Sequence, residues 1–442
     1  MEIELQIHLE GRWYKAATLS LSEEGLGYKG PSTLAYDFDY FAHFGAKAFA
    51  SDAPLAGCHA LSLSHPLTLE TVTSGHWPAF LLDLMPQGHA RRKLAEHLGL
   101  NEADRASDLA LLLRSATGGI GNIRIKEAAA AEEERLKGVK RQGVTEKDII
   151  TRSDRFIEVA DQYAILASGS SGLQGEWPKV AMTQARDGLY YPDSIVDDSD
   201  ATRHVIIKLV RSADPSDQLI LEGEAFYSII AHEIGLNVHE PSKYSEGVLM
   251  IPRFDRKKDQ EGRVTRLGQE SLVSALGISE FGYIGSHEDY IDILRKHSSR
   301  PFNDIVEYIK RDIANLALGN PDNHGRNSAF SKSSDGSIGL SPLFDFAPMR
   351  LSREGIMRST KWAAMRAENR DHRPDWSLII LNLFHEKQEQ TRIAEELAVF
   401  AMRLKTIPKS AKDIGVPSEI IERAMTRCEE IAEAVLASCS RI

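Results

Sequence analysis

The spacing of apolar residues changes character near Arg256, and this change constrains the fold more than any other feature of the sequence. Up to that point the chain alternates between strand-like and helix-like stretches, of which the β-branched run His204–Val210 is the clearest strand. Beyond it the pattern is mostly helical, and apolar residues recur about every 3.6 positions over Phe302–Ala317. The sequence therefore predicts one lobe of mixed strands and helices and a second lobe mainly of helices.

Shorter stretches extend this prediction along the chain. The segment Lys126–Lys147 is highly charged and poor in large apolar residues, so we expect an exposed, partly helical connection there. Other patterns predict strands at Ile3–Leu9, His59–His65 and Gly247–Arg256, two helices broken near Gly88 within Pro78–Leu100, a glycine-rich turn before a strand at Ile123–Ile125, and helices at Gly223–Gly235 and Ser418–Cys439.

Charge and cysteine content narrow the class of protein. There are 53 Lys and Arg against 64 Asp and Glu, and the net charge of -11 gives no global attraction for nucleic acid or for an anionic membrane. The 3 cysteines form no Cys-x-x-Cys pair, which argues against a disulfide framework or a zinc site and favours a reducing compartment. Without a signal-peptide pattern or a run of about 18 apolar residues, we expect a cytoplasmic protein with no membrane contact.

The loop Gly319–Phe330 concentrates residues that handle protons and metal ions. Asp322 precedes Asn327 by 5 residues, and Asp345 follows Asn327 by 18. Phosphoryl transfer to a hydroxyl needs a carboxylate that accepts the proton, and a carboxylate and a carboxamide that hold Mg²⁺ against the phosphates. These three residues supply that set, and we expect Asp345 on a buried strand. The alternative is a turn in which Asp322 and Asn327 cap local backbone groups.

Two further residues of this loop have two readings each. His324 either contacts a phosphate or supports the loop through hydrogen bonds. Arg326 is either a cation near the site or a solvated side chain.

Lys208 is a cation in the middle of an apolar strand, and Glu222 and Glu224 follow on the next predicted helix. Kinases fix a strand lysine against the α- and β-phosphates by pairing it with a helix glutamate. We predict this role for Lys208, with Glu224 as its partner. One alternative is that Lys208 is simply a charge on an edge strand. The others are that Glu222 is the partner, or that the glutamates lie on a solvated face.

Glycines and serines are dense in the segment Ser168–Met182, which also contains Lys179. Glycine lets backbone N–H groups approach phosphate oxygens closely, so we predict a phosphate-covering loop to which Lys179 adds charge, with a flexible linker as the alternative. The second glycine-rich run, Thr117–Asn122, is interpreted as a tight entry into a strand.

The stretch Met250–Arg256 joins the two predicted lobes. Phe254 packs either on an adenine ring or in the core. Asp255 reaches a ribose or forms a salt bridge with Arg256, and both readings stay open.

The order of these motifs resembles that of the HipA family of serine/threonine kinases, the toxins of type II toxin–antitoxin modules. The stretches that carry the resemblance are SSGLQGEWPK, VIIKL, HEIGLNV, PRFDRK, GNPDNHGRN and LFDFAPM, which span Ser170–Met349. The resemblance implies an α+β, two-lobed, protein-kinase-like fold. It divides the chain into an N-terminal subdomain (1–125), a charged connection (126–150), the ATP-binding part of the N-lobe (151–255) and a helical C-lobe with the catalytic loop (256–442).

The resemblance also implies ATP- and Mg²⁺-dependent phosphorylation of a cellular protein, for example an aminoacyl-tRNA synthetase. It assigns Asp322 as catalytic base, Asn327 and Asp345 as Mg²⁺ ligands, and Lys208 as the ATP lysine. Further ATP contacts are expected from Ser171, Gly172, Lys179, Phe254, Asp255, His324, Asn327 and Asp345. Family members autophosphorylate a serine of the glycine-rich loop, which here points to Ser171 or else Ser170. No helix-turn-helix pattern occurs, so any contact with DNA is expected to run through a HipB-like antitoxin.

The sequence departs from the family pattern in two places. Its glycine-rich loop is longer than usual and contains Trp177, and Pro252 stands at a hinge position often held by Glu, where it offers adenine no backbone N–H. Competing readings are a small-molecule kinase on the same fold, a pseudokinase binding module, and a metal hydrolase that uses Asp322, His324 and Asp345.

Overall fold

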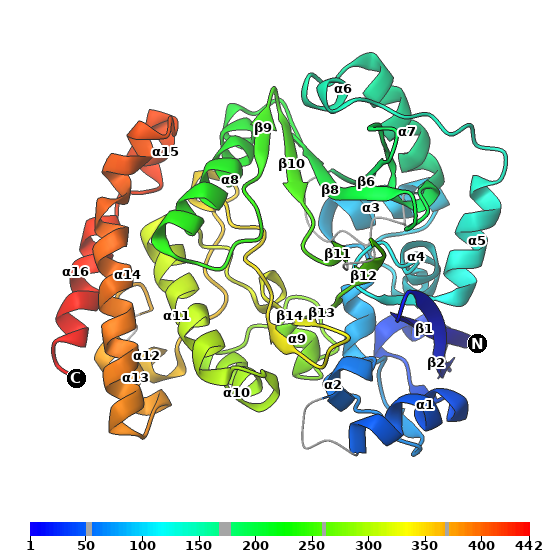
Figure 1. Ribbon diagram of the computed structural model, residues 1–442, viewed down its shortest axis with the longest axis horizontal. Helices are drawn as coiled ribbons and strands as arrows, with labels where there is room; N and C mark the ends of the chain where they lie inside the picture. Colours follow the sequence, from blue (N-terminus) through cyan, green and yellow to red (C-terminus); the bar gives the residue numbers. More distant parts are fainter. Residues whose placement is uncertain (50–54, 168–177, 259–261, 367–370) are drawn as a thin grey trace. The chain divides into compact units, whose positions relative to one another are not determined.

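The computed structural model describes residues 1–49, 55–167, 178–258, 262–366 and 371–442 (Figure 1). The chain forms two compact units, each built from segments that are distant in sequence. The mixed unit comprises residues 1–211, 244–282 and 329–338, and the helical unit comprises residues 212–243, 283–328 and 339–442. The chain thus has one unit of mixed strands and helices and one mainly of helices, but residues 212–243 belong to the helical unit and residues 256–282 to the mixed unit, so the units are not divided at the predicted boundary after residue 255.

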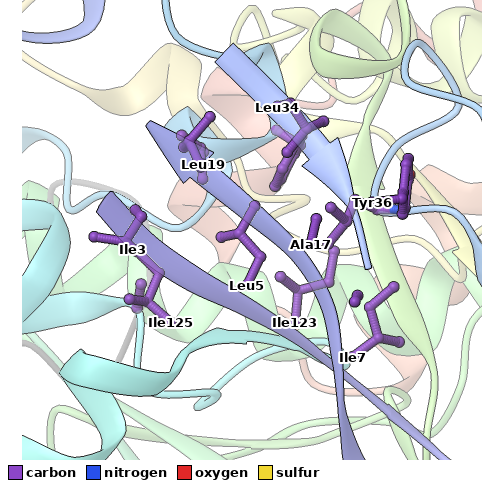
Figure 2. Packing of buried hydrophobic residues seen from close by; sticks show 14 of the residues in the cluster. Ile3, Leu5, Ile7, Ala17, Leu19, Leu34, Tyr36, Ile123 and Ile125 are labelled. Carbon is purple, nitrogen blue, oxygen red and sulfur yellow. The ribbon is translucent and has the colours of Figure 1, made fainter. Parts of the chain in front are cut away.

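The mixed unit begins with an antiparallel sheet whose strand order is β4-β3-β2-β1-β5. Alternate residues of β1 point to one face, and Ile3, Leu5 and Ile7 are almost fully buried there. Figure 2 shows these side chains beside Ala17, Leu19, Leu34, Ile123 and Ile125 of the neighbouring strands. The strands are β1 Glu2–Leu9, β2 Arg12–Leu21, β3 Ser32–Tyr36, β4 Val72–Ser74 and β5 Ile123–Ile125.

Short helices connect and follow these strands. They are η1 Glu24–Lys29, α1 Phe38–Phe49, α2 Leu55–His59, η2 Ala79–Asp83, α3 Gly88–Leu98, η3 Arg105–Ser107, α4 Asp108–Ser115, α5 Lys126–Leu136, α6 Glu146–Ile150 and α7 Asp154–Ala167.

A second sheet of the mixed unit has the strand order β7-β6-β8-β10-β9, with β8 at its centre. One face packs Val205 and Ile207 of β8 against Phe156 and Val159 of α7. Lys208, the residue after Ile207 on the same strand, therefore projects from the opposite face. The strands are β6 Lys179–Ala185, β7 Tyr190–Pro192, β8 Ala201–Leu209, β9 Lys243–Ser245 and β10 Val248–Pro252, and η4 Asp193–Ile195 follows β7.

Two small sheets complete the strands. They contain β11 Arg256–Lys258 paired with β12 Val264–Arg266, and β13 Gly268–Ser271, β14 Ala329–Lys332 and β15 Ile338–Leu340, with α9 Leu272–Ala275 after β13.

Helices form most of the helical unit, and α14 packs along α16 within it (Figure 1). Ile305, Ile309, Ile313 and Leu316 give α11 the buried stripe that its sequence predicts. None of the helices in the described part of the chain has the length and apolar character needed to cross a membrane. The helices are α8 Pro215–Ile234, α10 His287–His297, α11 Pro301–Ala317, η5 Gly325–Asn327, η6 Met349–Leu351, α12 Ala363–Arg366, α13 Trp376–Leu383, α14 Lys387–Asp413, α15 Ser418–Arg423 and α16 Cys428–Cys439.

The expected strand at His59–His65 is wrong. The segment is a buried turn with one isolated bridge between Ser62 and His65, because side chains rather than a neighbouring strand bind its backbone. The Glu270 carboxylate accepts hydrogen bonds from Leu63 N at 3.0 Å and from Ser62 Oγ at 2.5 Å. The alternating apolar residues of this segment are therefore buried in a turn and do not form a strand.

The helix expected at Ser418–Cys439 is interrupted. It ends as α15 at Arg423 and resumes as α16 at Cys428. The carbonyl of Ala424 in the gap would lie 2.6 Å from a Cβ on Gly319, so only a residue without a side chain fits opposite it.

The charged segment Lys126–Lys147 is helical over α5, and at its end it also contributes to the core. Ala128 and Val144 are buried, and Val144 exchanges backbone hydrogen bonds with Tyr190. The expectation of an exposed connection thus fits most of its charged side chains, but not Glu132, which is buried.

A buried carboxylate connects the end of β10 to the glycine-rich turn before β5. Asp255 is 4% exposed and accepts hydrogen bonds from Arg253 at 2.8 and 2.9 Å, from Arg256 at 2.9 Å and from Gly121 N at 2.9 Å. The same arginines donate to the carbonyls of Gly119 and Gly121. We call these groups the Asp255 network.

Both charge and burial act on the carboxyl of Asp255. Burial raises its pKa, but the charges of Arg253 and Arg256 outweigh burial and hold the pKa far below its usual range. A carboxylate whose pKa is depressed by folding stabilises the folded state above the unfolded pKa of about 3.9, and this stabilisation is lost as the pH falls below that value.

We therefore predict that Asp255→Asn lowers the free energy of unfolding by about 3–5 kcal/mol at pH 7, because both arginines lose a buried partner. The difference from the wild type is expected to shrink as the pH falls below about 4. Denaturant unfolding at a series of pH values measures it, with the exposed Asp39→Asn as control. A difference that is the same at every pH would contradict the assignment.

Candidate functional site

The loop after α11 is shaped by its glycine and asparagine residues. Gly319 has φ +67° and ends the helix against the carbonyl of Ala424. Asn320 then donates from its backbone to Asn315 O at 2.9 Å, and its Oδ1 accepts the backbone N–H of Asp322 at 3.3 Å. The chain thereby leaves the helix axis immediately before Asp322.

Asp322 and His324 lie beside each other in this loop. The Nε2 atom of His324 is 3.5 Å from Oδ1 of Asp322, and the side chains are 41% and 30% exposed. The imidazole is thus close enough to orient the carboxylate, which agrees with the supporting role. A phosphate contact by His324 stays a prediction. Arg326 is 8% exposed, so its solvated reading is wrong.

Asn327 is oriented by a hydrogen bond to the residue it is predicted to work with. Its Nδ2 donates to the backbone carbonyl of Asp322 at 3.0 Å. Since the amide nitrogen faces that carbonyl, Oδ1 is the side-chain atom presented for a cation. Gly325 makes this tight turn possible, because a Cβ there would lie 2.2 Å from the hydroxyl of Tyr290.

Asp345 lies on a bend rather than on the expected strand, since β15 ends at Leu340. Its φ of +54° is in the left-handed region, which Asp tolerates better than most residues. The backbone is held on one side by Leu343 N, which donates to Asn237 O at 2.8 Å, and on the other by Phe346, whose ring is 5.2 Å from that of Tyr227. The uncommon backbone conformation is therefore fixed by its neighbours.

Asp322, Asn327 and Asp345 line one small pocket inside the helical unit, which also receives His324 and Asn320. Two carboxylates and a carboxamide oxygen are the ligand types that Mg²⁺ takes in proteins, and Mg²⁺ keeps several waters beside them. In the described residues no three His, Cys, Asp or Glu side chains gather as a metal cluster, so the pocket does not supply a zinc-type ligand set. The donor set therefore fits magnesium.

Lys208 is 2% exposed on the central strand of the second sheet, so the edge-strand alternative is wrong. In register it faces Lys179 on β6 and Leu249 on β10. Two ammonium groups therefore project from neighbouring positions of one sheet face, where a polyanion would be attracted to both.

The remaining predicted residues are placed less fully. Phe254 is half-buried, and Glu224 is 6% exposed on α8 in the helical unit. The pairing of Glu224 with Lys208 stays a prediction. Asp255 forms the salt bridge that was its alternative reading, and its carboxylate is already bound by four donors. Ser170, Ser171 and Gly172 lie outside the described residues.

Sequence reasoning missed Asp312, which lines the same pocket from α11. Its carboxylate is 2% exposed and binds Arg358 and Trp362. The sequence carried a signal for it, because Asp312 lies 3 residues after Ile309 and 4 before Leu316 in the apolar stripe of the helix. A charged residue at such a position is expected to have a buried partner.

Comparison with solved structures supports the fold class. HipA in the complex of the toxin–antitoxin system HipA and HipB with its operator DNA from Shewanella oneidensis MR-1 superimposes with a TM-score of 0.59. The match covers 99% of this chain and 97% of that chain at 16% identity. The Helicobacter pylori proinflammatory kinase CtkA matches 54% of this chain and 91% of its own at 13% identity, with a TM-score of 0.36. The predicted α+β, HipA-like kinase fold is thus confirmed by the first match.

Comparison of sequences identifies the family. The model of the HipA N-terminal domain matches residues 40–126, and that of the HipA-like C-terminal domain matches residues 171–435. A Sinorhizobium fredii protein (strain NBRC 101917 / NGR234), named "Putative kinase Y4mE", is 29% identical over 299 residues, which cover 64% of this chain and 67% of that protein. Because the C-terminal family model alone spans more than half of the 442 residues, the chain belongs to the HipA family of kinases.

Proposed function

We propose that this HipA-family kinase is an ATP- and Mg²⁺-dependent serine/threonine protein kinase. The observation that carries the proposal is the shared pocket of Asp322, Asn327 and Asp345, in which Asn327 is oriented by the backbone of Asp322. The substrate is a hydroxyl of a cellular protein. By the family resemblance, a translation factor such as an aminoacyl-tRNA synthetase is the first class to test.

In this proposal Asp322 orients the acceptor hydroxyl and takes its proton, for which its partly exposed carboxylate is accessible. His324 at 3.5 Å holds that carboxylate in place. Asn327 Oδ1 and the Asp345 carboxylate hold the metal. Magnesium supplies charge neutralisation of the phosphate oxygens when it is bound.

The mixed unit supplies the nucleotide contacts in this proposal. Lys208 neutralises the α- and β-phosphates, and Lys179 adds a second positive charge from the facing strand. Phe254 packs on the adenine. Ser171 and Gly172 belong to the predicted phosphate-covering loop. Asp255 is not given a ribose contact, because the Asp255 network already uses its oxygens.

The partner in this proposal is a HipB-like antitoxin with a helix-turn-helix. The support is the nearly complete structural match to HipA of the Shewanella oneidensis complex, which contains HipB and operator DNA. DNA is then reached through the antitoxin.

The small-molecule kinase reading would be favoured by acidic groups that recognise a substrate beside Asp322. The pocket does contain Asp312, but the carboxylate of that residue is bound by Arg358 and Trp362. A pseudokinase is disfavoured by the intact set of Lys208, Asp322, Asn327 and Asp345. Protein phosphorylation remains the reading with most support.

We predict that Asp322→Asn lowers phosphate transfer from labelled ATP by at least about 100-fold, because the base is lost. Asp345→Asn is expected to have a similar effect through loss of a metal ligand, and Asn suits the left-handed backbone there. The exposed Asp292→Asn, also in the helical unit, is the matched control. Thermal unfolding checks that each variant is folded. A folded Asp322→Asn protein with wild-type activity would refute the catalytic assignment.

Autophosphorylation is tested separately. After incubation with ATP and Mg²⁺, mass spectrometry is expected to find phosphate on Ser171, or else on Ser170, and none in the Asp322→Ala protein. Ser171→Ala should move or abolish the signal. Phosphoserine at another position would overturn only the site assignment, whereas a folded wild-type protein that neither consumes ATP nor carries phosphate would count against the kinase chemistry.

A further inference from the structure

The buried carboxylate of Asp312 is unused by the proposed phosphoryl transfer. Its Oδ1 accepts a hydrogen bond from Arg358 at 2.5 Å and lies 3.3 Å from Nε2 of His287, while Oδ2 accepts Trp362 Nε1 at 2.9 Å. His287 in turn stacks on Trp362, with ring centroids 4.5 Å apart. Burial alone would raise the pKa of Asp312, but Arg358 and His287 hold it well below its usual range, so the carboxylate is charged.

Asp312 is one of three anchors of a single stretch, Arg358–Ala364, which we call the anchored segment. The second anchor is Asn323, next to Asp322. Its Oδ1 accepts the backbone N–H groups of Ser359 at 3.1 Å and Thr360 at 3.2 Å, and its Nδ2 donates to Thr360 O at 2.8 Å. The residue adjacent to the proposed base thus holds this segment directly.

The third anchor comes from the start of α10. The Glu288 carboxylate accepts the N–H groups of Ala363 at 2.8 Å and Ala364 at 3.1 Å, and His287 N donates to Lys361 O at 3.2 Å. Nearly every residue of the anchored segment is therefore fixed by the catalytic loop or by the helices beside it.

The residue just before the anchored segment is different in character. Met357 is 86% exposed, more than any other large apolar side chain in the described part of the chain. A rigid backbone next to the catalytic loop therefore presents an apolar side chain to solvent. Single exposed apolar residues are common. Met357 is unusual because three anchors fix the backbone of the residues that follow it.

We propose that Asp312 is a positioning residue that holds the anchored segment against the catalytic loop through Arg358 and Trp362. The exposed surface at Met357 then binds the residues of the substrate polypeptide on either side of the acceptor hydroxyl. This inference rests on the proposed protein kinase function and deepens it, because it names the part of the helical unit that aligns a protein substrate. Water is an acceptor without a polypeptide chain, so transfer to water does not need the anchored segment.

The variants must separate positioning from folding. Asp312→Asn alone leaves the half-buried charge of Arg358 without its carboxylate, which is destabilising. The double variant Asp312→Asn/Arg358→Met removes both charges and keeps side chains of similar size. Arg358→Lys retains the charge as the conservative variant, Met357→Glu alters only the exposed surface, and Asp292→Asn is the control.

The experiment uses the full chain with ATP, Mg²⁺ and dephosphorylated casein as protein acceptor. For the folded double variant we expect the KM for casein to rise at least about 10-fold, with a smaller fall in kcat. Met357→Glu should also raise this KM. Arg358→Lys, which keeps the charge, should leave the KM closer to the wild-type value than the double variant does. Hydrogen exchange should quicken at the amides of Ser359, Thr360, Ala363 and Ala364 in the double variant.

A folded double variant with the wild-type KM for casein, or with unchanged exchange at these amides, overturns the inference. Failure of the proposed function looks different, because the wild type then transfers phosphate to neither casein nor water. The substrate-aligning role falls in that case, while the exchange rates still decide whether Asp312 holds the anchored segment.

Discussion

The carboxylate of Asp255 is the interaction on which the mixed unit depends most. It lies where the second sheet ends, and its partners reach back more than 130 residues to the glycine-rich turn before β5. A desolvated charge is tolerated only while all of its partners are in place, so this contact admits little variation in geometry. The turn before β5 of the first sheet and the end of β10 of the second sheet are consequently fixed to each other by charge.

The helical unit repeats this principle with Asp312. There too a buried aspartate binds an arginine, but this arginine, Arg358, lies 46 residues further along the chain, so the contact fixes a loop against α11. The two networks differ in what they fix. Asp255 stabilises the framework around the strands, whereas Asp312 and Asn323 together fix the chain beside the loop that contains Asp322.

Features that depend only on residues close together in the chain could be predicted from the sequence. The stripe of α11, the β-branched strand around Lys208 and the loop that begins at Gly319 were all predicted, since each depends on neighbours in sequence. The backbone at Asp345 and the buried turn at His59–His65 were not, because contacts with distant residues decide them. Asp312 belongs to the same group, because its partners Arg358 and Trp362 are distant in sequence, whereas the salt bridge of Asp255 with its neighbour Arg256 was one of two predicted readings. The residue roles in phosphoryl transfer stay predictions.

The amide of Asn327, a residue that lines the pocket, has two ends: Nδ2 donates to the carbonyl of Asp322, which leaves Oδ1 as the acceptor. An amide is planar and rigid, so one end cannot move without moving the other. Binding of the proposed cation to Oδ1 would then be thermodynamically linked to the conformation of the loop that carries Asp322, the proposed base, and the linkage is reciprocal. A divalent ion that favours the braced loop must itself be bound more tightly by that loop. Assembly of the metal site and alignment of the base would then be a single cooperative event.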